Sequence, residues 1–477
     1  MRREFTIGTA WTAAASWTEQ AASAVLFVVI ARLIGAEAFG VAAMAFAFLF
    51  LGETMVRDTI TEAIVERASL EEGRLEATFV ALIGLSLVIV VVLAAAAHLA
   101  ATFYHEPQVA PLLLVGSPSV VMLAGSGVST ALLRRRLAYR SLAIRTILGV
   151  VAGGAIGVLL AANNFGAWSL VGQRLAQSGT NALLAISAAR WFPRRWPKKS
   201  EFLLIRGLGP QVMVLRTITL VLAQTPTVAL GVFANPQAVG MYAFSARLIE
   251  IVLHLVVNPI KGVAQSALAA MRRQTGSTAQ FFLDLAELAA LAGFSAFVGL
   301  ALVARPAIEV LMGPEWKAAA PVLALLCGAG ALTAVTSIQE SYLLAIDKLQ
   351  KFMRAALLEL FIGLVCVGLA SRFGPVMAAG AVVLRTVVAL PLRTAAALAP
   401  EVIPVMRFVR AIAAPALIAA GMALIVGVWR IASLGRIPDA IFVGLAIPLG
   451  VAGACALLFG LTPGVAARLR AFIKTES

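Results

Sequence analysis

Apolar segments long enough to cross a lipid bilayer follow one another along almost the whole chain. A membrane-spanning helix needs about 17 to 25 mainly apolar residues. Fourteen such segments can be marked, centred near residues 21, 50, 89, 121, 153, 178, 219, 248, 292, 331, 363, 386, 420 and 450. They leave no room for a folded soluble domain, and hydrophobic residues reach 61% of the chain. The sequence therefore predicts an all-α polytopic membrane protein with about 14 transmembrane helices.

Basic residues gather in the connectors between these segments. The net charge of +15 would suit a polyanion, but a nucleic-acid-binding protein carries such charge on a solvated surface and not between apolar runs. If Arg2 and Arg3 lie inside, inner connectors hold 26 of the 38 Lys and Arg, and outer connectors hold six. This asymmetry is the positive-inside rule. It predicts cytoplasmic N- and C-termini, no nucleic-acid partner, and RRRLAYR (134 to 140) as an inner turn.

The residues that commonly bind metals are scattered. The three cysteines and three histidines stand singly, with no spacing typical of a disulfide framework, a zinc site or a haem site. We therefore expect no metal and no cofactor.

An internal repeat divides the chain into two halves. IGAEAFGVAAMAFAFL (34 to 49) aligns with FANPQAVGMYAFSARL (233 to 248), which places Gly40 on Gly240, and two further matches follow at similar shifts. Six helices per half make the repeat parallel, so that two pseudo-symmetric bundles face each other. The predicted parts are a six-helix lobe at 1–189, a basic cytoplasmic linker at 190–205, a six-helix lobe at 206–398, and two additional helices with a cytoplasmic tail at 399–477.

Polar side chains inside the apolar segments form stripes with helical spacing. Hydroxyls in such helices often serve packing alone. Six intramembrane arginines facing lipid would cost about 15 to 20 kcal/mol together, so most must face protein or water. The candidate residues for a substrate cavity are Glu19, Gln20, Glu53, Arg57, Gln173, Arg174, Gln177, Arg216, Gln224, Arg247, Glu250 and Arg385.

Each arginine allows two interpretations, a structural ion pair or a substrate contact. Neighbouring acids favour pairing for Arg57 with Glu53 and for Arg247 with Glu250. No acid stands three or four positions from Arg174, Arg216 or Arg385, which favours these three as ligands. Arg393 is expected to extend to the inner surface.

Two short segments and the order of the helices carry a resemblance to a known family. The segments are LIGAEAFG (33 to 40) and ALLRRRLAYR (131 to 140), and the order is two six-helix lobes followed by two helices. In these features the chain resembles Wzx-like polysaccharide flippases of the multidrug/oligosaccharidyl-lipid/polysaccharide exporter superfamily, which includes the MATE transporters. The resemblance implies alternating access around a cationic cavity in a bacterial inner membrane. It implies an undecaprenyl-pyrophosphate-linked oligosaccharide as substrate, for exopolysaccharide or lipopolysaccharide synthesis, with a polysaccharide polymerase and export machinery as further partners.

Two other classes of function stay open at this point. A multidrug or organic-cation antiporter of the same superfamily would favour an acidic, aromatic-lined pocket, and it is kept open by Glu19, Glu53, Glu250 and Glu340. A membrane polymerase or ligase is less favoured, because the longest outer loop is only RPAIEVLMGPEWK (305 to 317). We therefore expect transport and no catalytic residues.

Overall fold

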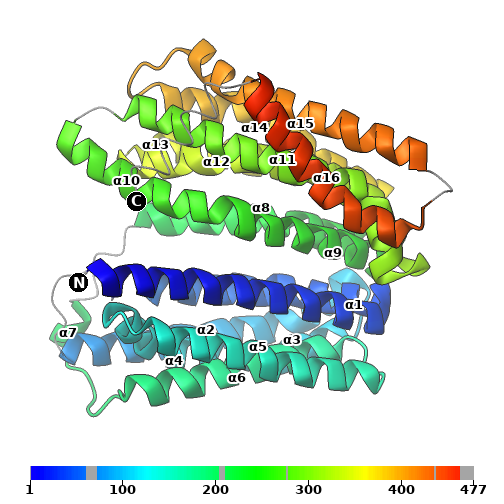
Figure 1. Ribbon diagram of the computed structural model, residues 1–477. Coiled ribbons are helices and arrows are strands. Elements are labelled where there is room, and N and C mark those ends of the chain that lie inside the picture. The colour runs from blue at the N-terminus through cyan, green and yellow to red at the C-terminus, as the bar shows by residue number, and fades with distance from the viewer. Residues whose placement is uncertain are drawn as a thin grey trace. The chain divides into compact units, whose positions relative to one another are not determined.

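The computed structural model describes residues 2–60, 72–203, 210–275, 278–346, 348–433 and 437–461 (Figure 1). Every regular element in this part of the chain is a helix. Contacts between residues divide the chain into two compact units, Met1–Ala243 and Phe244–Ser477. They are called unit 1 and unit 2 below.

Unit 1 begins with α1 (Arg2–Ile60), which is two helices joined at Gly35. Gly35 has φ 78° and ψ 169°, a backbone conformation that glycine adopts without steric cost. The rings of Phe27 and Phe39 lie 5.6 Å apart, whereas twelve residues of a continuous helix would separate them by about 18 Å. The chain therefore reverses direction at Gly35, and α1 supplies the first two predicted membrane helices.

The remaining helices of unit 1 are joined mostly by short connections. They are α2 (Glu72–Tyr104), α3 (Val109–Gly116), α4 (Pro118–Arg135), α5 (Tyr139–Ala162), α6 (Trp168–Ala189), α7 (Lys199–Leu203), α8 (Pro210–Phe233) and the beginning of α9 (Pro236–Val252). Because α8 packs against α1, it belongs to unit 1 by contact, although the repeat makes it the first helix of the second lobe. The lobe boundaries drawn from the repeat stay a prediction.

Glycines set the closest helix contacts of unit 1. Gly149, Gly153 and Gly157 recur every fourth residue along α5, and a β-carbon on Gly153 would lie 2.7 Å from the carbonyl oxygen of Gln173 in α6. A β-carbon on Gly40 would lie 1.7 Å from the carbonyl oxygen of Pro236. At these crossings the backbones approach as small residues allow in membrane helices.

Unit 2 continues α9 through a π-helix, η2 (Leu253–Val257), into α10 (Asn258–Thr275). The rings of Phe282 and Tyr342 stack in its core with centroids 4.4 Å apart. The expected outer loop at 305–317 is shorter than predicted, because residues up to Met312 are helical despite Pro306. The further elements are α11 (Ala279–Met312), η3 (Pro314–Trp316), α12 (Ala319–Ala345), α13 (Leu349–Ala370), η4 (Ser371–Phe373), α14 (Pro375–Leu398), α15 (Val405–Ser433) and α16 (Asp439–Leu461).

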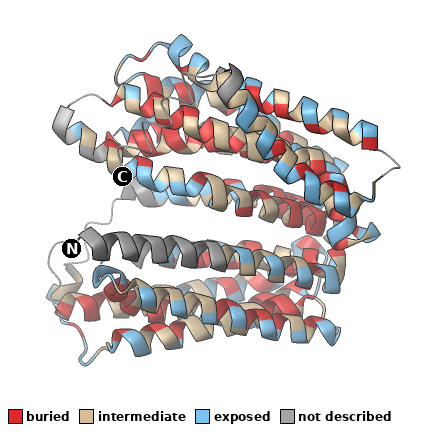
Figure 2. Cartoon of the chain, viewed as in Figure 1, coloured by how far each residue is buried: buried red, intermediate tan, exposed pale blue. Residues whose placement is uncertain are grey.

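Twelve helical segments of the described chain are long and apolar enough to cross a membrane. One of them, Glu19–Arg57, holds both helices of α1. A further helix, α6, is 22 residues long but carries a polar stripe. The fold therefore agrees with the predicted fourteen helices. Figure 2 shows exposed faces along the helices of both units, and large apolar side chains such as Val91 and Leu424 are more than half exposed, as lipid-facing residues are.

Candidate functional site

A buried ion pair in unit 1 joins α1 to α6. Arg174 Nε donates to Glu53 Oε1 at 2.9 Å, and a second guanidinium nitrogen pairs with the other carboxylate oxygen. Ser119 Oγ on α4 also donates to Glu53, at 2.8 Å. The guanidinium lies over the ring of Phe50, 4.5 Å from its centroid. Glu53 therefore binds partners from two helices, and its carboxylate is neutralised inside unit 1.

This pair bears on the selection of Arg174 as a ligand. Arg174 was favoured because no acid stands nearby in sequence, but its acid is 121 positions away. A substrate phosphate would have to compete with Glu53 for the same guanidinium. The binding roles of Glu53 and Arg174 stay predictions.

A group of charged residues lies where α1, α4 and α5 approach each other in unit 1. Arg145 interacts electrostatically with Arg134, Glu19 and Arg57, and it donates to Thr130 Oγ1 at 2.9 Å. We call Arg57, Arg134 and Arg145 the arginine cluster. Two like charges therefore act on Arg145, and such a gathering of guanidinium groups is suited to an anion.

Sequence reasoning included Arg57 and Glu19 in the candidate site but missed Arg145. The inner turn was predicted at RRRLAYR (134 to 140), whereas α5 begins at Tyr139 and carries Arg145 on its second turn. The apolar run of α5 begins near Tyr139, before Arg145. This run could have shown that Arg145 belongs to the helix and not to the connector. Gln20 is half-buried beside Glu19.

The predicted glutamines of α6 lie at a helix interface. A β-carbon on Gly157 would meet the Cβ of Gln173 at 2.9 Å, and one on Gly153 would meet the Cβ of Gln177 at 2.8 Å. The stems of both glutamines therefore pack against α5, and both side chains are half-buried. Their contact with a substrate stays a prediction.

Arg216 and Gln224 lie on α8. Arg216 is exposed and Gln224 is half-buried. No carboxylate in the part of the chain that the structure describes forms a salt bridge with Arg216. An arginine exposed on a membrane-spanning helix is costly in lipid, so its surroundings must be water, headgroups or an anionic ligand.

A polar stripe runs along α9, η2 and α10 in unit 2, and it interrupts a membrane-spanning segment. Arg247 Nη1 donates to Glu250 Oε2 at 2.8 Å, with 40% and 51% of the two side chains exposed. Two turns further on, Asn258 Nδ2 and His254 Nδ1 lie 2.6 Å apart, both exposed. Since π-helices within α-helices often mark functional sites, the stripe is a candidate surface for a polar ligand.

Two arginines of α14 share one buried carboxylate on α13. Arg385 Nε lies 3.6 Å from Glu359 Oε1, and Arg393 pairs with Oε2. Arg393 lies over the ring of Phe352 in the first turn of α13, and its extension to the inner surface stays a prediction. Arg385 is 8% exposed and Glu359 is 4% exposed, so this group is interior to unit 2. The role of Arg385 in binding stays a prediction.

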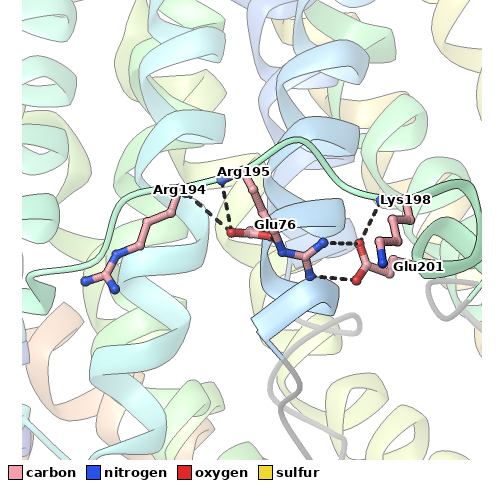
Figure 3. Close-up of polar contacts among 5 residues, drawn as sticks. All are labelled: Glu76, Arg194, Arg195, Lys198 and Glu201. Atoms are coloured by element: carbon pink, nitrogen blue, oxygen red, sulfur yellow. Dashed lines mark hydrogen bonds and ion pairs between the residues drawn. The ribbon is translucent and has the colours of Figure 1, made fainter.

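The basic linker is held to α2 by acidic side chains, as Figure 3 shows. Glu76 Oε1 accepts hydrogen bonds from the backbone amides of Arg194 and Arg195, both at 3.3 Å. Arg195 Nε lies 3.0 Å from the other Glu76 oxygen, and its terminal nitrogens donate to both oxygens of Glu201. Glu201 also accepts from the amide of Lys198 at 2.7 Å, which caps α7. We call Glu76, Arg195 and Glu201 the linker clamp.

The acids that kept a cation antiporter open all have basic neighbours. Glu53 pairs with Arg174 and Glu250 with Arg247. Glu340 accepts from Lys261 at 2.8 Å, and Glu19 is influenced by Arg145. Among the described residues, no group of three His, Cys, Asp or Glu side chains is placed to hold a metal ion.

A family model described as "Polysaccharide biosynthesis protein" matches residues 29–321. The succinoglycan biosynthesis transport protein ExoT of Rhizobium meliloti is 26% identical over 302 residues, which are 62% of this chain and 60% of that protein. The lipopolysaccharide biosynthesis protein WzxC of Escherichia coli is 23% identical over 351 residues, 72% of this chain and 70% of that protein. The chain thus matches less than two thirds of ExoT.

Solved structures share the fold at low sequence identity. A lipid II flippase MurJ in an inward closed conformation matches with a TM-score of 0.76 and 12% identity, covering 94% of this chain and 97% of that one. An inward-facing multidrug resistance MATE family transporter of the MOP superfamily matches with a TM-score of 0.61 and 14% identity, covering 84% and 98%. The chain therefore shares its fold with these two transporters.

Proposed function

Since the chain belongs to the polysaccharide biosynthesis protein family, we propose that it flips an undecaprenyl-pyrophosphate-linked oligosaccharide across a bacterial inner membrane. ExoT is named as a transport protein of succinoglycan biosynthesis and WzxC as a lipopolysaccharide biosynthesis protein. The chain itself acts by transport and not by catalysis.

The position of Arg216 is the main support for the proposal. It is an exposed cation on a spanning helix, and no described carboxylate neutralises it. A guanidinium binds phosphate oxygens through two parallel charge-assisted hydrogen bonds. The pyrophosphate of the lipid supplies such oxygens at the membrane surface, where Arg216 lies six residues after the start of α8.

The arginine cluster of unit 1 provides a second anion-binding group. Arg57 and Arg134 act on Arg145 with like charge, and Glu19 acts on it with opposite charge. An anion bound there relieves this repulsion, which gives the pyrophosphate an electrostatic advantage over a neutral or cationic solute. An inside-negative potential then favours outward movement of the head group by about 5 kcal/mol for two charges at 100 mV.

The polar stripe of unit 2 is suited to the sugars. His254 and Asn258 are uncharged hydrogen-bonding groups that can both donate and accept, as sugar hydroxyls can. The pair between Arg247 and Glu250 adds polar groups with no net charge. The undecaprenyl tail stays in the lipid while alternating access exposes the head group on the other side.

A cation antiporter is less consistent with this charge arrangement. A cationic substrate would have to displace Arg174, Arg247 or Lys261 from its carboxylate.

We further propose cytoplasmic N- and C-termini, which the asymmetry of Lys and Arg supports, and the lobes 1–189 and 206–398, which the repeat supports. A polysaccharide polymerase and export machinery are the proposed partners.

Replacing Arg216 tests the proposal. Arg216→Ala should abolish polymer export while the protein accumulates normally in the membrane, because an exposed side chain contributes to recognition and little to folding. Arg216→Lys should restore export in part, since it keeps the charge and loses the bidentate geometry. The matched control is Arg305→Ala, which removes another exposed arginine, 68% exposed and paired only with Glu309 in its own helix. Wild-type export by Arg216→Ala would refute the role of Arg216.

A further inference from the structure

Residues 190–199 form a surface that is both basic and aromatic, and we call it the linker surface. Phe192 is 65% exposed and Trp196 is 78% exposed. Four basic residues of the same stretch, Arg190, Arg194, Lys198 and Lys199, are exposed as well. Large aromatic side chains of this exposure need a partner, because water is a poor environment for them.

Two aromatic residues of the linker surface, Trp191 and Phe192, pack beside the beginning of a candidate membrane span. Phe79 belongs to the candidate span Gly73–Tyr104, and its ring is 5.9 Å from that of Trp191 and 6.2 Å from that of Phe192. Phe79 lies six residues beyond the start of the span, about 9 Å along the helix. The linker therefore packs against the first turns of a membrane helix.

The linker clamp fixes this surface and leaves most of its charge available. Glu76 accepts the backbone amides of Arg194 and Arg195, so the side chain of Arg194 is not used by that contact and points away from Glu76 (Figure 3). Among the basic side chains of the linker surface, the guanidinium of Arg195 lies between two carboxylates of the described residues. The other basic side chains can meet an external anion.

We propose that the linker surface binds the headgroups of anionic phospholipids, with Phe192 and Trp196 inserted at headgroup depth. Basic residues beside a membrane helix attract anionic lipids of the cytoplasmic leaflet, and aromatic rings with a polar edge concentrate at that boundary. An acidic protein partner would also meet the charge, but it would not explain why the rings of Trp191 and Phe192 pack against the beginning of a membrane span. The choice of the cytoplasmic leaflet rests on the inner placement of the linker proposed above.

The fluorescence of Trp196 in the full-length protein tests the proposal. The protein is placed in nanodiscs made of phosphatidylcholine and phosphatidylglycerol, with the acyl chains of the phosphatidylglycerol either brominated or not. The conservative variant Trp196→Phe identifies the contribution of this residue by difference. We expect bromination to quench that difference signal strongly. A difference signal that bromination leaves unchanged would overturn the proposal and would point to a protein partner.

A charge variant separates lipid binding from mere proximity to the bilayer. Arg194→Gln/Lys198→Gln/Lys199→Gln should lose most of the quenching by brominated phosphatidylglycerol. The control, Arg407→Gln/Arg410→Gln, removes exposed arginines beside another span and should keep it. Equal quenching in both variants would overturn the electrostatic part of the proposal. The fluorescence measurement needs no sugar substrate. A negative result would therefore refute lipid binding by the linker surface without bearing on the proposed transport function.

Discussion

Three arginines inside the described membrane helices pair with carboxylates from neighbouring helices. Glu53 forms a salt bridge with Arg174, and Glu359 forms salt bridges with Arg385 and Arg393. The sequence predicted that these arginines must face protein or water, because lipid would cost too much. It could not predict the partners, because spacing rules apply within one helix, whereas these pairs cross between helices.

Removal of Glu53 should therefore destabilise the protein strongly. Glu53→Gln leaves Arg174 buried beside an uncharged amide, and breaking a buried ion pair from one side costs about 3 to 5 kcal/mol. The effect can be measured as a lowered melting temperature in detergent. In the matched control, Glu250→Gln, the pair is half-exposed, so its loss should cost about 1 kcal/mol or less. Equal melting temperatures for the two variants would contradict the interior role of Glu53.

At the scale of the helix, the contact between α5 and α6 depends on glycines. Gly153→Ala would place a β-carbon 2.7 Å from the backbone carbonyl of Gln173, and overpacking of this kind costs about 1 to 3 kcal/mol. Nothing lies within 4 Å of a β-carbon at Gly84 in α2. Gly84→Ala should therefore raise the melting temperature slightly, since alanine favours a helix by up to about 1 kcal/mol. Shifts of the same sign in both variants would refute this account.

The linker clamp gives an element-scale dependence on pH. The hydrogen bond from Arg195, followed by that from the Lys198 backbone, lowers the pKa of Glu201 below its usual value of 4.5. A lowered folded-state pKa means that the contact stabilises fully above the unfolded-state pKa. This stabilisation is lost as the pH falls through the folded-state pKa.

Acidification should accordingly release Glu201 from Arg195 and Lys198 only below the usual pH range for glutamate. Arg195→Gln removes the main cause of the lowered pKa, so the release should move to higher pH. Trp196 fluorescence measured against pH reports the release, and Arg190→Gln, which leaves the clamp intact, should follow the wild type. Coincident profiles for the wild type and Arg195→Gln would show that Arg195 does not set the pKa of Glu201.

At the scale of the whole molecule, the sequence predicted the number and type of helices well. Bilayer thickness fixes the length of each apolar run, so helices could be marked without knowledge of contacts. The ends of helices were less predictable, as α11 shows by continuing through Pro306 to Met312. The path of a substrate depends on contacts between helices, and the candidate residues of the site therefore remain predictions, with Arg145 missed altogether.

Labelling of introduced cysteines tests the orientation. In a background lacking Cys327, Cys366 and Cys455, a cysteine at Arg136 should be protected from an impermeant thiol reagent in intact cells. A cysteine at Glu315 should react, because the alternation of spans places it outside. Permeabilised cells provide the control, since both positions should then react. The opposite pattern in intact cells would reverse the proposed topology.

Ionic strength acts unequally on the arginines of the two units. Salt screens exposed charges and leaves buried pairs nearly unaffected. The Arg247–Glu250 pair, with side chains 40% and 51% exposed, weakens as salt rises, whereas the Arg174–Glu53 pair, at 16% and 9%, does not. A rise in ionic strength thus leaves the ion pair inside unit 1 nearly unchanged, while it loosens the ion pair of the unit 2 stripe and frees its two charged groups.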